Sequence, residues 1–139
     1  MNIRHICIKD YKKYITLINS NISKENYIDF FNNVLGKLHI IYIIEIDDNI
    51  IGSGTLFIEK KLTYGGCNMG HIENIFIDKT YRGNGYGEKV VKKLLEYAQI
   101  NKCYRVDLNC TEELTPFYNK NKFTVNNVCM NILFKDNFN

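Results

Sequence analysis

A glycine-rich turn between a strand-like run and an amphipathic stretch is the feature that most constrains this 139-residue chain. Residues 69–77 are dense in β-branched and aromatic side chains, which predicts a largely buried strand. After the turn, apolar side chains recur at three- and four-residue spacing: Val90, Val91, Leu94, Leu95 and Ala98. Charged side chains fill the positions between them, so the spacing predicts a helix with one buried face.

The turn itself, RGNGYG over residues 82–87, indicates a phosphate site. Glycines at the start of a helix leave backbone N–H groups without acceptors, and no β-carbon blocks an approaching anion. A Walker loop would need Lys and Ser or Thr after its last glycine, but Gly87 is followed by Glu88. A Rossmann fingerprint that starts at Gly83 would also need glycine at position 88. Two interpretations remain. The turn is either a phosphate-binding loop that is neither of the Walker nor of the Rossmann type, or a glycine-rich connection that binds no ligand.

The remaining patterns predict one α/β domain over residues 1–139, with a mixed and largely antiparallel sheet. Alternating or continuous apolar runs predict the strands, and Asp47-Asp48-Asn49 between two such runs predicts an antiparallel hairpin. Ser, Thr or Asp residues before apolar periodicity predict the helix starts. The predicted order β-αα-β-β-β-α-β-α-β comprises strand 3–8, helices capped by Asp10 and Ser23, strands 39–46, 50–58 and 69–77, the helix after the turn, strand 104–110, a short helix capped by Thr111, and strand 125–134.

Composition narrows the class of protein. A hydrophobic content of 45% and a charged content of 24% are typical of a globular protein, and no apolar run reaches membrane-spanning length. The net charge of +3 is too weak, and the lysines too dispersed, to indicate nucleic-acid binding. The five cysteines form no Cys-x-x-Cys pair and no metal-like spacing with histidine, which predicts reduced thiols, no metal site and a cytoplasmic location.

The motif Arg-x-x-Gly-x-Gly between a strand and a helix resembles the acetyl-coenzyme A (acetyl-CoA) pyrophosphate loop of the GNAT superfamily of N-acetyltransferases. Further segments are similar to the glucosamine 6-phosphate N-acetyltransferases, one family within that superfamily: residues 58–61, 70–75, 81–87, 103–110 and 117–120. The resemblance implies the GNAT fold and transfer of acetyl from acetyl-CoA to the amine of glucosamine 6-phosphate. It also implies a homodimer with the sugar site at the subunit interface.

The same resemblance implies the residues of the site. The acceptor contacts would come from Lys61, Leu62, Thr63, Tyr64, Glu73, Asn74 and Ile75. The cofactor contacts would come from Ile75, Phe76 and Ile77 for the pantetheine, from Arg82, Gly83, Asn84, Gly85, Tyr86 and Gly87 for the pyrophosphate, and from Asn109 and Tyr118. In GNAT proteins the strand of residues 69–77 splays from the fifth strand, and one of its backbone N–H groups faces the thioester carbonyl.

Glu73 and Tyr118 are the predicted catalytic residues. Alternation predicts that Glu73 shares a strand face with Ile75 and Ile77, where its carboxylate would take a proton from the acceptor ammonium. By resemblance, the Tyr118 hydroxyl would protonate the departing thiolate of CoA. The alternatives are an exposed strand carboxylate and an ordinary amphipathic tyrosine. His71 lies on the Glu73 face, where a histidine is more often a core or rim residue than a participant.

Several positions depart from the family pattern. Asn74 and Asn109 replace aspartates, Leu114 replaces an asparagine, Lys122 a glycine, and Leu133 an arginine suited to phosphate. These departures keep two other functions open. One is acetyl transfer to another small-molecule or protein amine, and the other is an acyl-CoA-binding module without turnover.

Overall fold

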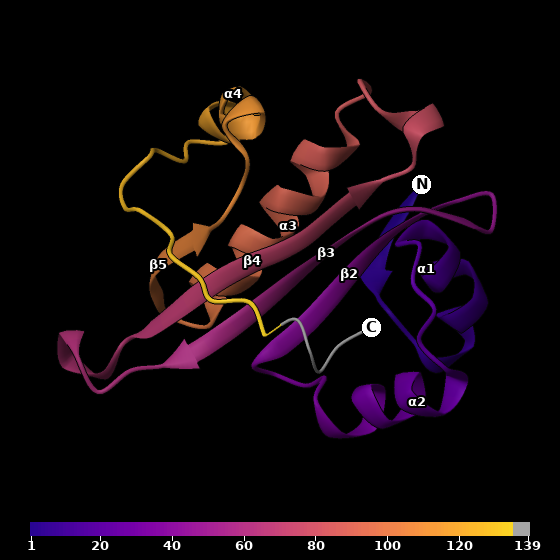
Figure 1. The fold of residues 1–139 in the computed structure, drawn as a ribbon, viewed down its shortest axis with the longest axis horizontal. Helices are drawn as coiled ribbons and strands as arrows, with labels where there is room; N and C mark the ends of the chain where they lie inside the picture. Colours follow the sequence, from indigo (N-terminus) through magenta and orange to yellow (C-terminus); the bar gives the residue numbers. More distant parts are fainter. Residues whose placement is uncertain (135–139) are drawn as a thin grey trace. The chain divides into compact units, whose positions relative to one another are not determined.

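The computed structural model describes residues 1–134, and its centre is a five-stranded sheet in the order β1-β2-β3-β4-β5 (Figure 1). The strands are β1 (Asn2–His5), β2 (His39–Ile46), β3 (Asn49–Lys60), β4 (Asn68–Ile77) and β5 (Cys103–Leu108). Neighbouring strands are antiparallel except β4 and β5, which are parallel. The predicted mixed, largely antiparallel sheet is therefore confirmed.

Residues 1–134 contain four helices: α1 (Tyr11–Leu17), α2 (Lys24–Asn33), α3 (Tyr86–Ile100) and α4 (Thr115–Lys120). Short 3-10 turns precede or connect them: η1 (Ile8–Asp10), η2 (Tyr64–Gly66), η3 (Lys79–Tyr81) and η4 (Glu112–Leu114). The sheet, α1, α2 and α3 form one compact unit, Met1–Leu108, and a second unit begins at Asn109. The interpretation of residues 1–139 as one domain stays a prediction.

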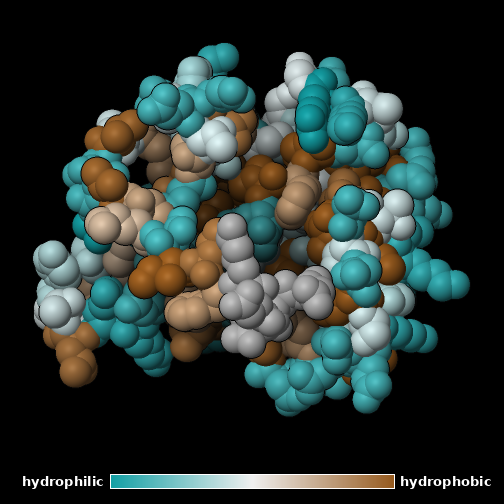
Figure 2. Space-filling model, viewed as in Figure 1, coloured by the Kyte–Doolittle hydropathy of each residue, from teal (hydrophilic) through white to brown (hydrophobic). Residues whose placement is uncertain are grey.

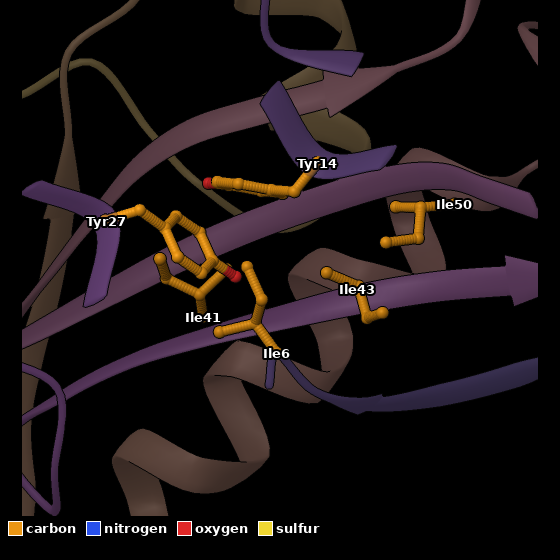
Figure 3. Packing of buried hydrophobic residues seen from close by; sticks show 6 residues of the cluster. All are labelled: Ile6, Tyr14, Tyr27, Ile41, Ile43 and Ile50. Carbon is orange, nitrogen blue, oxygen red and sulfur yellow. The ribbon is translucent and has the colours of Figure 1, made fainter. Parts of the chain in front are cut away.

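The sheet of the first unit carries buried side chains on both of its faces. One face packs against α3, whose Val90, Val91, Leu94 and Ala98 are buried. The other face carries a cluster of buried side chains from α1, α2 and the strands, drawn in Figure 3: Ile6, Tyr14, Tyr27, Ile41, Ile43 and Ile50. Because β2 lies between both layers, residues 40–44 are all buried, which explains its continuous apolar run.

Local sequence signals locate the connections correctly. Asp47 and Asp48 form a two-residue hairpin turn with φ of 47° and 61°, the positive values that a type I′ turn requires. Ser23 caps α2, since its hydroxyl oxygen accepts a hydrogen bond of 3.1 Å from the Asn26 backbone N–H. Both features agree with the sequence-based expectation.

Asp10 corrects one prediction, because its side chain does not cap α1. The buried carboxylate instead accepts hydrogen bonds from the Cys7 backbone N–H at 2.8 Å and from two Arg4 nitrogens at 2.8 and 2.9 Å. Burial alone would raise the pKa of Asp10, but the Arg4 and Cys7 contacts outweigh it and lower the pKa to about 2. Asp10 therefore ties the end of β1 to η1.

We expect Asp10→Asn to lower the free energy of unfolding by about 2 kcal/mol at neutral pH. The carboxylate has a lower pKa in the folded chain than its ordinary 3.8, so its stabilisation is complete above that value and is lost as pH falls toward 2. Urea unfolding at neutral pH and near pH 2 should show a difference between variant and wild type only at neutral pH. Asp48→Asn, in the exposed hairpin turn, is the control; an equal Asp10→Asn effect at both pH values would contradict the ion-pair account.

The predicted strand 125–134 is wrong, because these residues have no regular secondary structure. Several large apolar side chains are exposed on the protein, as Figure 2 shows, and those of this segment are Val125, Val128, Met130, Ile132, Leu133 and Phe134. A strand needs a neighbour for its backbone hydrogen bonds, and no strand of residues 1–134 pairs with this segment. Within the same residues, no helix is long and apolar enough to cross a membrane.

Candidate active site

The parallel pair β4 and β5 separates in the middle of β4. The two strands pair from Asn68 opposite Cys103 to Ile72 opposite Leu108, where β5 ends, while β4 continues to Ile77. Within residues 1–108, the β4 edge over residues 73–77 therefore has no β5 partner. An unpaired strand edge presents backbone donors and acceptors that can bind an extended, amide-containing ligand.

A β-bulge lies at the start of this free edge. Thr55 pairs with Glu73 and Ser53 with Phe76, so the single residue Gly54 faces two residues of β4. The first of these, Asn74, has a φ of 54°. Asparagine and aspartate are the residues other than glycine that adopt this conformation most readily, so asparagine at this position preserves the backbone that an aspartate would give.

The bulge corrects the predicted position of Glu73. A β-carbon on Gly54 would lie 2.7 Å from Ile75 Cδ1 and 2.9 Å from Leu94 Cδ1, which places Ile75 on the α3 face. Glu73 is opposite Thr55, the residue after Gly54, so its side chain lies on the other face. The prediction that Glu73 shares a face with Ile75 and Ile77 is therefore wrong, since the bulge interrupts the alternation.

The sequence did not reveal that Gly54 lies opposite the bulge, where there is no room for a side chain. We expect Gly54→Val to lower the free energy of unfolding by about 3 kcal/mol, because its side chain would overlap Ile75, Leu94 and Val90. Denaturant unfolding of the variant measures this cost. Gly36→Val is the matched control, since nothing lies within 4 Å of a β-carbon built on Gly36. Equal stabilities for the two variants would mean that the bulge leaves room above Gly54.

Glu73 is exposed on a part of the sheet that carries aromatic rings. The His39 ring meets the Phe57 ring edge-on at 5.7 Å, and the Phe57 ring stacks on His71 at 6.0 Å. Burial lowers the pKa of His39, and the charge of Glu73 partly opposes that shift. Glu73 thus lies on the same sheet face as His71, two residues further along β4, and its carboxylate is accessible to an incoming amine.

The glycine turn has the geometry of an anion site. Gly83 and Gly85 have φ of 77° and 79°, values that favour glycine, although a β-carbon on either would meet nothing within 4 Å. Gly85 is the N-cap of α3 and provides no side-chain cap. The first N–H groups of α3 therefore have no side-chain cap as acceptor. They lie at the positive end of the dipole of this 15-residue helix.

Side chains around the turn hold it in shape and add positive charge. The Arg82 Nε donates a hydrogen bond of 3.0 Å to the Ile77 carbonyl, which ties the turn to the end of β4. The Asn84 side-chain amide donates to the Tyr81 and Arg82 carbonyls, both at 3.1 Å. Lys89 Nζ lies 5.3 Å from the centre of the Tyr86 ring. The turn thus combines bare amides with two nearby cations, as a diphosphate would require.

The predicted acceptor residues fall into two separate groups. Lys61, Leu62, Thr63 and Tyr64 lie in the connection from β3 to β4, where Lys60 pairs with Asn68. Glu73 is five residues further along β4, so it lies roughly 17 Å from this connection at the usual strand rise. Leu62 is fully exposed, and Tyr64 stacks on Tyr104 at 4.5 Å. One chain therefore leaves Leu62, Thr63 and Tyr64 apart from Glu73. The Lys61 ammonium, in contrast, reaches Glu59, which contacts His71, two residues before Glu73.

Asn109 and Tyr118 belong to the second unit. Asn109 follows the last residue of β5, so the predicted strand 104–110 ends earlier than expected. Tyr118 lies in α4 and is buried, with its ring edge-on to Phe117 at 4.9 Å and to Phe123 at 5.9 Å. Burial, together with the Cys110 thiol, raises the pKa of Tyr118, so its hydroxyl keeps its proton at neutral pH.

His71 has closer polar partners than the sequence suggested. Its ring nitrogens contact Asp107 of β5 at 2.6 Å and Glu59 of β3 at 2.9 Å. In the sequence, Glu59 and Asp107 are polar residues next to apolar ones, Asp107 within a predicted strand and Glu59 directly after one, which indicates polar positions on the sheet. That they contact His71 follows only from the strand register, which the sequence did not reveal. Elsewhere in residues 1–134, as here, no group of three or more His, Cys, Asp or Glu side chains could hold a metal ion.

Comparison with known proteins identifies the relatives of this chain. The model of the Acetyltransferase (GNAT) family matches residues 7–123. A probable glucosamine 6-phosphate N-acetyltransferase of Oryza sativa subsp. japonica is 39% identical over 104 residues, which cover 72% of this chain and 63% of that protein. A glucosamine 6-phosphate N-acetyltransferase of Dictyostelium discoideum is 30% identical over 141 residues, covering 95% of this chain and 90% of that protein.

The fold comparison gives the same result. The crystal structure of glucosamine-6-phosphate N-acetyltransferase from Arabidopsis thaliana superposes with a TM-score of 0.92 at 30% identity, covering 96% of this chain and 98% of that one. The match to the rice relative spans less than two thirds of that relative's length. Because the family model matches most of the chain, across both units, this protein belongs to the GNAT family of acetyltransferases.

Proposed function

We propose that this chain transfers the acetyl group of acetyl-CoA to the amine of glucosamine 6-phosphate. The products would be N-acetylglucosamine 6-phosphate and CoA, a step toward UDP-GlcNAc. The observation that carries the proposal is the free, bulged edge of β4, which continues through η3 into the glycine turn. The names of the relatives support the acceptor, since both the rice and the Dictyostelium proteins are named for glucosamine 6-phosphate.

Acetyl-CoA fits the two features of the first unit. Its pyrophosphate matches the bare amides of residues 83–87 and the positive charge of Arg82. Its pantetheine carries two amides that match the free β4 edge at Ile75, Phe76 and Ile77. A backbone N–H near the bulge would donate to the thioester carbonyl, where negative charge develops as the amine attacks.

The proposed reaction needs three proton transfers. Glu73 would take a proton from the acceptor ammonium, so that the nitrogen lone pair attacks the thioester carbon. The nitrogen of the tetrahedral intermediate then loses a second proton to solvent, the carbon–sulfur bond breaks, and the sulfur leaves with the electron pair. Tyr118 would donate its hydroxyl proton to this thiolate, a role that is open to it because the buried hydroxyl is protonated at neutral pH.

We also propose a homodimer in which the sugar site is shared. The backbone of Leu62, Thr63 and Tyr64 lies beyond the pair of Lys60 with Asn68, five residues of β4 from Glu73 and thus roughly 17 Å away, which exceeds the length of a hexose phosphate. Two copies could each supply one of the two groups to the same sugar. We further propose a reducing, cytoplasmic setting for this assembly, in keeping with the five cysteines, all within residues 1–134, none of which is joined to another by a disulfide.

An acetyl-transfer assay tests the proposal. Purified protein, acetyl-CoA and a panel of amines are combined, and released CoA thiol is measured. We expect turnover with glucosamine 6-phosphate and little with glucosamine, which lacks the phosphate. Turnover with other amines instead would favour the second candidate function, acetyl transfer to another small-molecule or protein amine. Leu133 supports that alternative, because it stands where the family has an arginine suited to phosphate. Tight acetyl-CoA binding without any turnover would identify a binding module.

A further inference from the structure

His71 joins three adjacent strands through its two ring nitrogens. Nδ1 contacts Asp107 Oδ1 on β5 at 2.6 Å, and Nε2 contacts Glu59 Oε2 on β3 at 2.9 Å. The other Glu59 oxygen, Oε1, accepts from Lys61 Nζ at 3.2 Å. One imidazole therefore links β3, β4 and β5 on the face opposite α3. We name these four side chains, Lys61, Glu59, His71 and Asp107, the His71 cluster.

The double contact requires a protonated ring. Neutral imidazole has one N–H donor and one acceptor nitrogen, whereas a carboxylate only accepts hydrogen bonds. Both nitrogens face carboxylates, so only imidazolium can donate to Asp107 and Glu59 together. Burial by itself lowers the pKa of His71, but the hydrogen bonds and negative charges of Glu59 and Asp107 outweigh it, and the net shift is upward. Lys61, the cation of the cluster besides His71 itself, is held by the other oxygen of Glu59.

The cluster lies at the point where the sheet opens. His71 pairs with Asp107 one position before the last β4·β5 pair, Ile72 with Leu108. Beyond that pair, β4 carries Glu73 and the bulge at Asn74 without support from β5. Phe57, stacked on the His71 ring, packs the same face. Any change in how β3, β4 and β5 are held here would move the backbone on which the reaction depends.

We propose that His71 is a positioning residue for acetyl transfer, because its contacts with Glu59 and Asp107 fix the strands where β4 and β5 part and thereby fix Glu73 and the bulge. This inference rests on the proposed function of the same site. His71 itself does not touch the reacting atoms in this account. Asp107 shares its role, since it provides the contact across the parting strands.

The test is the pH dependence of turnover in two variants, His71→Gln and Asp107→Asn, with the amine that the wild type acetylates best. Below the pKa of His71, we expect each variant to have a kcat about tenfold below that of the wild type, as expected for a small misplacement of catalytic groups. The affinity for CoA, measured by calorimetry, should stay within about twofold, since the glycine turn lies elsewhere. Above the pKa, the wild type also loses one contact, so the ratio of the rates should approach one.

His5→Gln, at the end of β1, is the matched control and should keep the wild-type kcat. A His71 titration by NMR adds a readout without turnover: Asp107→Asn should lower the His71 pKa. Wild-type kcat in both variants, or a rate ratio that does not change with pH, would overturn the positioning role while leaving the proposed function intact. A wild type that acetylates no amine would overturn both.

Discussion

Gly85→Glu is expected to abolish binding of acetyl-CoA, lowering affinity by about 100-fold or more. Gly85 has a φ of 79°, which strains any residue with a β-carbon, and it is the N-cap of α3. A carboxylate at this position would place negative charge where the pyrophosphate is proposed to bind. The strain and the repulsion act in the same direction, so this change should have the largest effect on the cofactor.

Isothermal calorimetry with CoA measures the affinity directly, and thermal unfolding shows whether the variant keeps its fold. Gly85→Ala separates the two causes, because alanine introduces the strain without the charge. Gly36→Glu is the matched control, since Gly36 is exposed and has open space around it. If folded Gly85→Glu protein bound CoA as well as the wild type, the turn would have another purpose and the acetyl-transfer proposal would fail.

Glu73→Gln is expected to lower kcat by about 100-fold, the lower end of what a general base contributes. Glutamine keeps the size and the hydrogen-bonding oxygen of the side chain but cannot take a proton at neutral pH. The acceptor ammonium would then lose its proton only to solvent. The KM for acetyl-CoA should change little, since the proposed cofactor contacts are backbone groups of β4 and the glycine turn.

Steady-state kinetics with both substrates test this expectation. Glu96→Gln on α3 is the control, because Glu96 is a solvent-accessible glutamate whose ion-pair partner is Lys93, at 3.6 Å. We expect it to turn over like the wild type. A Glu73→Gln variant with undiminished kcat would remove Glu73 from the mechanism and would assign the proton transfer to water or to another group.

Much of the fold followed from local patterns. The continuous apolar run of β2 and the paired aspartates after it predicted the first hairpin, and both are present. The amphipathic spacing after the glycine turn predicted α3, whose apolar residues are buried. These predictions succeed because helix periodicity, hairpin turn chemistry and glycine conformation are properties of a few neighbouring residues.

Other features could not be found in this way. The apolar alternation of residues 125–134 predicted a strand, but a strand forms only where another strand accepts its hydrogen bonds. Asp10 has the sequence context of a helix cap, yet Arg4 and Cys7, brought near by β1 and η1, take up its carboxylate. In both cases a tertiary partner decided between conformations that the local sequence equally allowed.

The sequence by itself determined the glycine turn, the helix that follows it and the segments that form the five strands of the sheet. Only the tertiary structure decided which way Glu73 points, because a single extra residue in β4 at Asn74 reverses the faces of everything after it. It also decided that His71 lies between Glu59 and Asp107, which are far apart in the chain. Strand register is set by long-range pairing, and no local pattern encodes a bulge or a contact across three strands.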